Sequence, residues 1–159
     1  MVRLAKKEDC NQVFELMRQL SSHPFTENEF EECFRYNLEN NYILVYEQFQ
    51  SVLGCGILSI DYPLHFSSKR AEIVNLIVDI DARCKGIGKM LLATLEEIAD
   101  EKGCVQIEVA SGKQREDAHK FYFREGYSGT HYKLVKKLSV EVSNAANFSR
   151  LFGAGAVEG

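Results

Sequence analysis

The sequence lacks any apolar run long enough to cross a membrane. Apolar stretches such as residues 42–46 and 73–78 have the length of a strand, whereas a membrane-spanning helix needs roughly 18 apolar residues. Arg3, Lys6 and Lys7 stand where a secretion signal would need an apolar core. These absences exclude a membrane-spanning protein and predict a cytoplasmic one.

Cysteine is scarce and histidine is scattered. The five cysteines are odd in number and include no C-x-x-C pair, which excludes a disulfide framework and a zinc ribbon and predicts reduced thiols. The four histidines show no H-x-H or H-x-x-x-H spacing, so we expect no structural metal. Whether a divalent ion accompanies the substrate is left open by the sequence.

Neither sign of charge dominates. Nineteen Lys and Arg stand against 23 Asp and Glu, giving a formal net charge of −4. The Lys6-Lys7 and Lys136-Lys137 pairs are too short to form a basic stripe for nucleic acid. The composition therefore predicts a protein without a nucleic-acid or membrane partner.

Hydrophobic periodicity predicts a single α/β (α+β) domain over residues 1–138. Strands are expected at 2–4, 42–47, 52–61, 70–79, 105–110 and 130–138, and helices at 13–20, 26–39, 88–102 and 116–125. The near-continuous apolar run 73–78 predicts a strand buried on both faces. A strand, helix, strand order in the second half implies one parallel pair in a mostly antiparallel sheet with helices on both faces. Residues 139–159 read as a C-terminal tail, either flexible or added for expression.

A glycine loop, Arg83-Cys84-Lys85-Gly86-Ile87-Gly88, follows the predicted buried strand and opens an amphipathic helix. Helix N-termini offer about four unpaired N–H groups and a partial positive charge, and glycine lets a phosphate approach the backbone. Arg83, Lys85 and Lys89 add cations, so the loop predicts phosphate binding, although two glycines can also simply form a tight turn. A dinucleotide fingerprint would need glycine at Leu91, and a Walker A loop would need Ser or Thr at Met90.

Two motifs resemble those of the GCN5-related N-acetyltransferase (GNAT) family. Its cofactor signature, [Q/R]-x-x-G-x-[G/A], matches Arg83, Gly86 and Gly88. Its helical motif, A-x-x-F-Y-x-x-x-G-[F/Y], matches five residues further along the chain: Ala118, Phe121, Tyr122, Gly126 and Tyr127. The order of elements predicted above is also that of the family, so the resemblance implies the GNAT fold over residues 2–138.

The resemblance implies an enzyme, an acyltransferase that uses acetyl-CoA as co-substrate. It implies backbone contacts from the central strand to the pantetheine arm and contacts from the glycine loop to the phosphates. The cofactor-binding residues expected on this basis are Leu76, Ile77, Val78, Arg83, Cys84, Lys85, Gly86, Ile87, Gly88, Lys89 and Arg115. Cys84 stands where the family often has glycine, which is harmless if its backbone φ is negative. Arg115 stands where many relatives have an asparagine that touches the cofactor, so Arg115 could instead meet a phosphate of cofactor or substrate.

Acetyl transfer to an amine needs an acid for the departing thiolate and a deprotonated amine. By resemblance, Tyr122 is the acid and Glu72 is the base. Without the resemblance, Tyr122 reads as a core aromatic and Glu72 as a surface carboxylate at a strand end. A water chain, or loss of the amine's proton before binding, could replace Glu72. The acetyl group is expected to pass directly from acetyl-CoA to the amine, without a covalent acyl-enzyme. A protein that carries the acyl group on the Cys84 thiol is an alternative.

The acceptor is the least determined feature. The segment 117–127, with His131, Tyr132 and Lys133, most resembles the aminoalkylphosphonate N-acetyltransferases. His65, Lys69 and Arg70, on the loop before the central strand, could receive a phosphonate. Amino sugars, aminoglycosides, polyamines and protein amines are alternative acceptors, and a non-catalytic acyl-CoA sensor is the alternative of another class. Because many members of the family form dimers, the resemblance also allows a homodimer.

Overall fold

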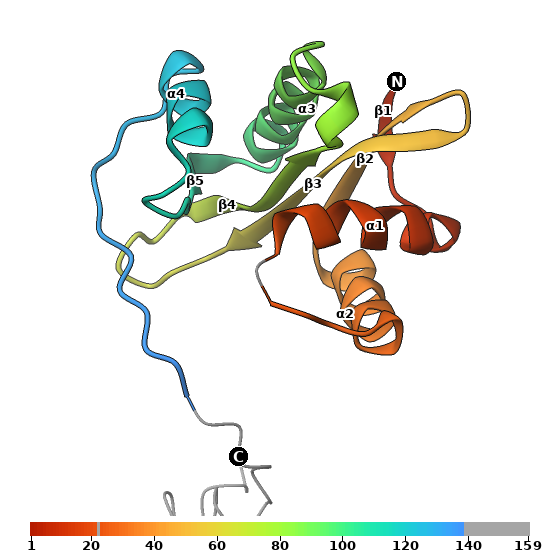
Figure 1. Cartoon of the computed structure of the whole chain (residues 1–159). Coiled ribbons are helices and arrows are strands. Elements are labelled where there is room, and N and C mark those ends of the chain that lie inside the picture. Colours follow the sequence, from red (N-terminus) through yellow and green to blue (C-terminus); the bar gives the residue numbers. More distant parts are fainter. Residues whose placement is uncertain (22, 139–159) are drawn as a thin grey trace, which may run out of the picture. The chain divides into compact units, whose positions relative to one another are not determined.

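The computed structural model describes residues 1–21 and 23–138 (Figure 1). The chain divides into a compact unit of residues 1–128 and a second unit of residues 129–159. The strands of the first unit are β1 (Val2–Leu4), β2 (Tyr42–Gln48), β3 (Ser51–Asp61), β4 (Lys69–Val78) and β5 (Cys104–Val109). Its α-helices are α1 (Cys10–Leu20), α2 (Glu27–Asn40), α3 (Ile87–Glu101) and α4 (Glu116–Arg124).

The strand expected over 130–138 is wrong. Residues 129–138, the described part of the second unit, form no helix or strand, and Tyr132, Leu134, Val135 and Leu138 are exposed. A strand is stabilised by pairing across a ladder, and the alternation of side chains along one segment does not supply that pairing. The predicted tail at 139–159 lies outside the described residues.

The five strands form one mixed sheet in the order β1-β2-β3-β4-β5. All neighbours are antiparallel except β4 and β5, which are parallel and are separated in the chain by α3. The predicted fold class, with one parallel pair in a mostly antiparallel sheet, is therefore confirmed.

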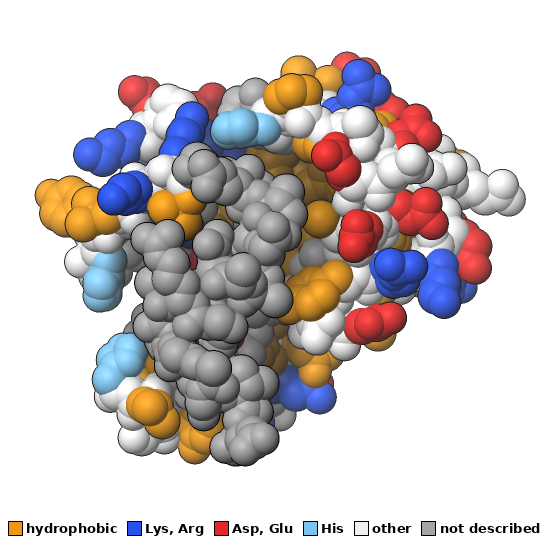
Figure 2. Space-filling model, turned by 90° about the horizontal axis from the view of Figure 1, so that it is seen from below, with side chains coloured by type: hydrophobic (Ala, Val, Ile, Leu, Met, Phe, Trp, Pro, Cys, Tyr) orange, Lys and Arg blue, Asp and Glu red, His pale blue; other side chains and the backbone are white. Residues whose placement is uncertain are grey.

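Two apolar layers cover the sheet. In Figure 1, α3 and α4 lie on one face and α1 and α2 on the other. The core under α3 contains the fully buried Leu91, Leu92 and Leu95, and the core under α1 contains Val13 and Leu16. Figure 2 shows the face that carries α1 and α2, where acidic side chains gather; the five glutamates of α2 are exposed.

Burial of the central strand differs from the prediction. Ile73 and Ile77 are buried, but Val74 is 46% exposed. The register between β3 and β4 shifts between Ile57 and Leu58, so Val74 lacks an opposite residue. A bulge of this kind turns one side chain out of the alternation, which periodicity in one strand does not reveal.

Local sequence signals place the helix ends. The Thr26 side chain accepts from the Glu29 N–H at 3.3 Å, and the Glu29 carboxylate accepts from the Thr26 N–H at 2.8 Å, so the expected capping box starts α2. Gly103 and Gly126, with φ of 74° and 96°, follow the ends of α3 and α4. Among the described residues, the helices are too short or too polar to cross a bilayer.

The N-terminus is tied to the sheet by an ion pair. Arg3 donates to both carboxylate oxygens of Asp9 at 2.8 Å and also bonds Glu47. Asp9 is 5% exposed. The hydrogen bonds from Arg3 hold the pKa of Asp9 below its usual value, against the opposing effect of burial. The pair therefore belongs to the folded structure rather than to a solvated surface.

Candidate active site

The parallel strands β4 and β5 separate before β4 ends. Their ladder stops at the pair Ile73 and Val109, whereas β4 continues to Val78. Beyond that point the β5-facing edge of β4 makes no ladder bonds among the described residues, and Leu76, Ile77 and Val78 line a cavity. The Val78 carbonyl accepts from the Arg83 Nε at 3.2 Å. The other backbone groups of Leu76 and Val78 that point to this edge are available to an extended ligand.

The glycine loop turns from β4 into α3. Gly86, at the N-cap, has φ of 78°, a left-handed conformation suited to glycine. No described side chain caps the start of α3, so N–H groups of its first turn remain for a ligand. This geometry favours an anion at the helix N-terminus.

Cysteine at position 84 would be harmless with a negative φ, but its φ is 61°. In the left-handed region a Cβ approaches a carbonyl oxygen, at a cost of about 1–2 kcal/mol. Cys84 is therefore strained, and it lines the cavity beside Gly86.

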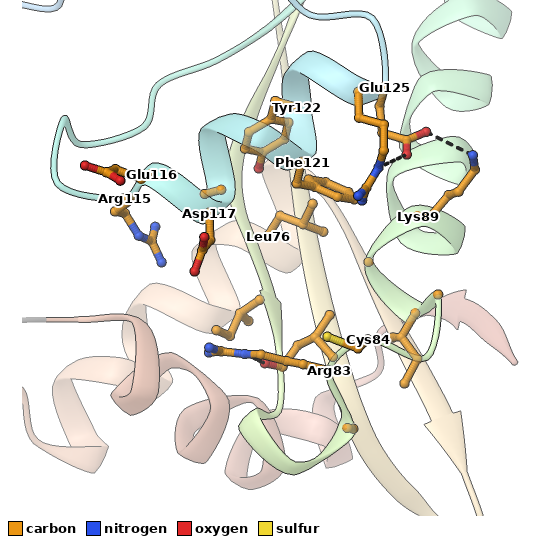
Figure 3. A pocket seen from close by; sticks show the side chains of 18 of the residues that line it. Leu76, Arg83, Cys84, Lys89, Arg115, Glu116, Asp117, Phe121, Tyr122 and Glu125 are labelled. Carbon is orange, nitrogen blue, oxygen red and sulfur yellow. Dashed lines mark hydrogen bonds and ion pairs between the residues drawn. The ribbon is translucent and has the colours of Figure 1, made fainter.

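The cavity has a volume of about 920 Å³, within the range of small-molecule sites. All the expected cofactor-binding residues line it except Lys85, whose ammonium group instead donates to the Asp81 carbonyl at 3.2 Å. Figure 3 shows Arg83 and Cys84 on one side and α4 on the other. The structure thus brings the strand, the loop and Arg115 to one cavity.

Part of one cavity wall was not expected from the sequence, although Arg115 and Tyr122 of the same wall were. It comes from α4 and the turn before it and comprises Gln114, Glu116, Asp117, Ala118, Phe121, Arg124 and Glu125. The usable signal was the helical motif, since residues three and four apart share a helix face. Glu125 pairs with Lys89 of α3 at 3.2 Å and with Arg124 at 3.5 Å (Figure 3), which links the two helices at the cavity wall.

Tyr122 lies between the core and the cavity. Its side chain is 9% exposed, and its hydroxyl points into the space between α4 and the loop of Arg83 and Cys84 (Figure 3). Burial raises the pKa of the phenol, and the positive charge of Arg115 opposes this rise. Tyr122 is therefore protonated at neutral pH and can donate a proton into the cavity.

Glu72 and Tyr122 lie on opposite sides of the sheet. Ala71 and Ile73 point into the core with α3, which also contains Tyr122. Because side chains alternate along a strand, Glu72 faces the side of α1 and α2, and it does not line the cavity. It precedes Ile73, the last β4 residue paired with β5, so Glu72 lies close to the point where the strands separate.

Lys69 and Arg70, expected on the loop before the central strand, are instead the first two residues of β4, and both already have polar partners. Arg70 is on the same face as Glu72 and pairs with Glu108 at 3.4 Å and with Asp61 at 4.0 Å. Its Nε is buried without a partner among the described residues. Lys69 donates to the Lys102 carbonyl at 3.1 Å. Of these cations, Arg70 is the one placed beside Glu72.

Within residues 1–21 and 23–138, no group of three or more His, Cys, Asp or Glu side chains is arranged to hold a metal ion. The polar lining of the cavity includes the carboxylates of Glu116, Asp117 and Glu125. It also includes four cations and the backbone N–H groups at the start of α3; the cations are Arg83, Lys89, Arg115 and Arg124. Such groups fit a ligand with phosphates and an extended arm.

Comparisons with known proteins agree with this geometry. The model for the acetyltransferase (GNAT) family matches residues 10–127. The aminoalkylphosphonate N-acetyltransferase of Salmonella typhimurium LT2 is 32% identical over 139 residues, 86% of this chain and 90% of that protein. The uncharacterized N-acetyltransferase YhdJ of Bacillus subtilis 168 is 29% identical over 77% of this chain and 86% of its own. A transcriptional regulator from Bacillus halodurans C-125 has a similar solved structure, with a TM-score of 0.78 and 25% identity over 87% of this chain and 99% of that one.

Proposed function

Because this chain belongs to the GNAT family of acetyltransferases, we propose that it transfers an acetyl group from acetyl-CoA directly to the primary amine of an aminoalkylphosphonate. The observation that carries the proposal is the cavity beside the separated strands, which joins the glycine loop, the free edge of β4 and Tyr122. The relative from Salmonella typhimurium, named for this acceptor class, supports the choice of substrate.

The cavity fits acetyl-CoA residue by residue. The first turn of α3, with Gly86 and Gly88, would hold the pyrophosphate, and Arg83 and Lys89 add positive charge. The unpaired edge of β4 from Leu76 to Val78 would bond the amide groups of the pantetheine arm. When bound, acetyl-CoA supplies an acetyl group activated as a thioester. The remaining steps belong to this chain's own residues.

Tyr122 acts as the proton donor. Its hydroxyl points into the cavity, and its phenolic proton would pass to the sulfur as the C–S bond breaks and the C–N bond forms. A general acid of this kind contributes typically 10²–10⁴-fold to the rate. Glu72, on the other side of the sheet, would take a proton from the incoming ammonium group, directly or through water. The separation of β4 and β5 lets the two residues act from opposite sides.

The face of Glu72 suits a zwitterionic acceptor. Arg70 and Glu72 are two residues apart on the same face of β4, which places their Cα atoms about 7 Å apart. Glu72 would meet the ammonium group while Arg70, with its buried Nε, would meet the phosphonate. Glu108 and Asp61 hold Arg70 on this face through ion pairs.

Thiol release from acetyl-CoA, measured with a panel of amines that includes 2-aminoethylphosphonate, tests the proposal. Tyr122→Phe should bind acetyl-CoA as the wild type does and lose at least 100-fold in kcat. Thiol release with another amine would support an acetyltransferase but contradict the aminoalkylphosphonate as its acceptor. Binding of acetyl-CoA without release for any amine would favour an acyl-CoA sensor, and acetyl label retained on the denatured protein would favour a carrier at Cys84.

The acceptor is tested by comparing 2-aminoethylphosphonate with ethanolamine, which has a hydroxyl group in place of the phosphonate. Arg70→Met should raise KM for the phosphonate about tenfold or more, as expected for the loss of a charge-assisted contact, and leave KM for ethanolamine unchanged. Lys69→Met is the matched control, because Lys69 precedes Arg70 but donates to Lys102. Equal effects on both amines would argue against a phosphonate contact at Arg70.

A further inference from the structure

We propose that Tyr127, held by Glu96, is a positioning residue that fixes the ring of Tyr122 for proton donation; this inference rests on the proposed role of Tyr122. The Tyr127 hydroxyl donates to Oε1 of Glu96 at 2.9 Å. Glu96 belongs to α3, whereas Tyr127 follows the end of α4. The bond therefore ties the turn after α4 to a neighbouring helix.

The backbone at the end of α4 directs Tyr127 back onto Tyr122. Gly126 adopts φ of 96°, and the Tyr127 N–H donates to the Tyr122 carbonyl at 3.0 Å. This turn brings the two rings to a centroid separation of 5.5 Å at an interplanar angle of 62°. Such edge-to-face pairs are a favoured aromatic geometry.

Tyr122 is thus enclosed by aromatic rings. Phe121 lies 5.2 Å away at 66°, and both rings pack against the same core. Among residues 1–21 and 23–138, the Tyr122 side chain makes no hydrogen bond that would orient its ring, so the direction of the ring depends on these packing contacts. Among them, the contact with Tyr127 is itself anchored, through the bond to Glu96.

The hydroxyl of Tyr127 is poorly placed to act as the acid itself. It already donates to a carboxylate, and burial together with this hydrogen bond raises the pKa of its phenol. Tyr127 does not line the cavity. The two tyrosines therefore have different roles: Tyr122 points into the cavity and donates the proton, and Tyr127 holds the Tyr122 ring in place.

The experiment is a double-mutant cycle on kcat and KM with saturating acceptor. Tyr127→Phe and Glu96→Ala should each lower kcat about tenfold, because small displacements of a reacting group are costly, with KM for acetyl-CoA unchanged. The double variant should lose no more kcat than either single variant, since each single substitution already removes the same Tyr127–Glu96 hydrogen bond. Glu96→Gln, which keeps a side-chain oxygen as acceptor, should retain most of kcat.

Gln12→Ala controls for a general loss of stability. Gln12 accepts from the Val52 N–H at 2.8 Å and thereby links α1 to β3, in the part of the fold under α1, so its loss should lower the melting temperature without changing kcat. Wild-type kcat in Tyr127→Phe, additive losses in the double variant, or an equal loss in Gln12→Ala would each overturn the positioning role. If Tyr122→Phe itself keeps full kcat, the proposed acid fails, and with it the role of Tyr127. If Tyr122→Phe loses kcat and the Tyr127 and Glu96 variants do not, only the positioning role of Tyr127 is overturned.

Discussion

Two glycines of the same loop should respond in opposite directions to a single added methyl group. Gly86 has φ of 78°, and a Cβ there would meet nothing within 4 Å. Gly88 lies in the first turn of α3, and a Cβ there would meet Val78 and Phe121 at 3.6–3.9 Å, which is ordinary van der Waals contact. Neither alanine is crowded, so the backbone conformation decides the difference.

The magnitudes follow from that conformation. Alanine at Gly86 costs about 1–2 kcal/mol for the left-handed backbone and recovers about 0.4–1 kcal/mol because the unfolded chain loses freedom. The net effect of Gly86→Ala is a loss of about 1 kcal/mol. Gly88→Ala has no such backbone cost, because Gly88 lies within α3. It should therefore raise the free energy of unfolding by about 0.8–1.0 kcal/mol, the difference in helix propensity between Ala and Gly. For a folded unit of this size, 1 kcal/mol shifts Tm by about 4 °C.

Calorimetry of the ligand-free protein measures both effects in one buffer. We expect Gly86→Ala to melt about 4 °C below the wild type and Gly88→Ala a few degrees above it. A Gly86→Ala protein as stable as the wild type, or a Gly88→Ala protein that melts as low as Gly86→Ala, would refute the reasoning. The second result would mean that space in the cavity wall, rather than φ, limits the position.

Four other predictions follow from individual residues. Cys84→Gly should raise Tm slightly, because φ of 61° costs about 1–2 kcal/mol that only partly returns as unfolded-state entropy. Leu95→Ala, at a fully buried position, should lower the free energy of unfolding by about 3 kcal/mol in urea titrations. Asp9→Asn should lower the free energy of unfolding by about 3 kcal/mol at neutral pH. Because the pKa of Asp9 is lower in the folded state, the wild type should melt above the variant at pH values above the unfolded pKa of Asp9. This difference in Tm should shrink as the pH falls through the folded pKa. Arg115→Gln should move the alkaline limb of the kcat profile to higher pH, because removing the cation leaves burial to raise the pKa of Tyr122 further.

Features set by neighbouring residues could be predicted from the sequence. The capping box of Thr26 and Glu29 and the glycines that end α3 and α4 depend on contacts within a few residues. The glycine loop was expected at the start of a helix for the same reason, and the structure places it there. The strand expected over 130–138 failed because alternation is local, whereas a strand also needs a neighbour.

The sequence by itself determined the order of the elements from β1 to α4, the place of the glycine loop at the start of α3 and, through two motifs, the family. Only the tertiary structure decided the early end of the ladder at Ile73 and Val109, the opposite faces of Glu72 and Tyr122, and the bond from Tyr127 to Glu96. These three features depend on the register of strands and on the packing of helices distant in the chain. The physical reason is that periodicity reports which side of its own element a residue occupies, whereas an active site depends on which elements meet.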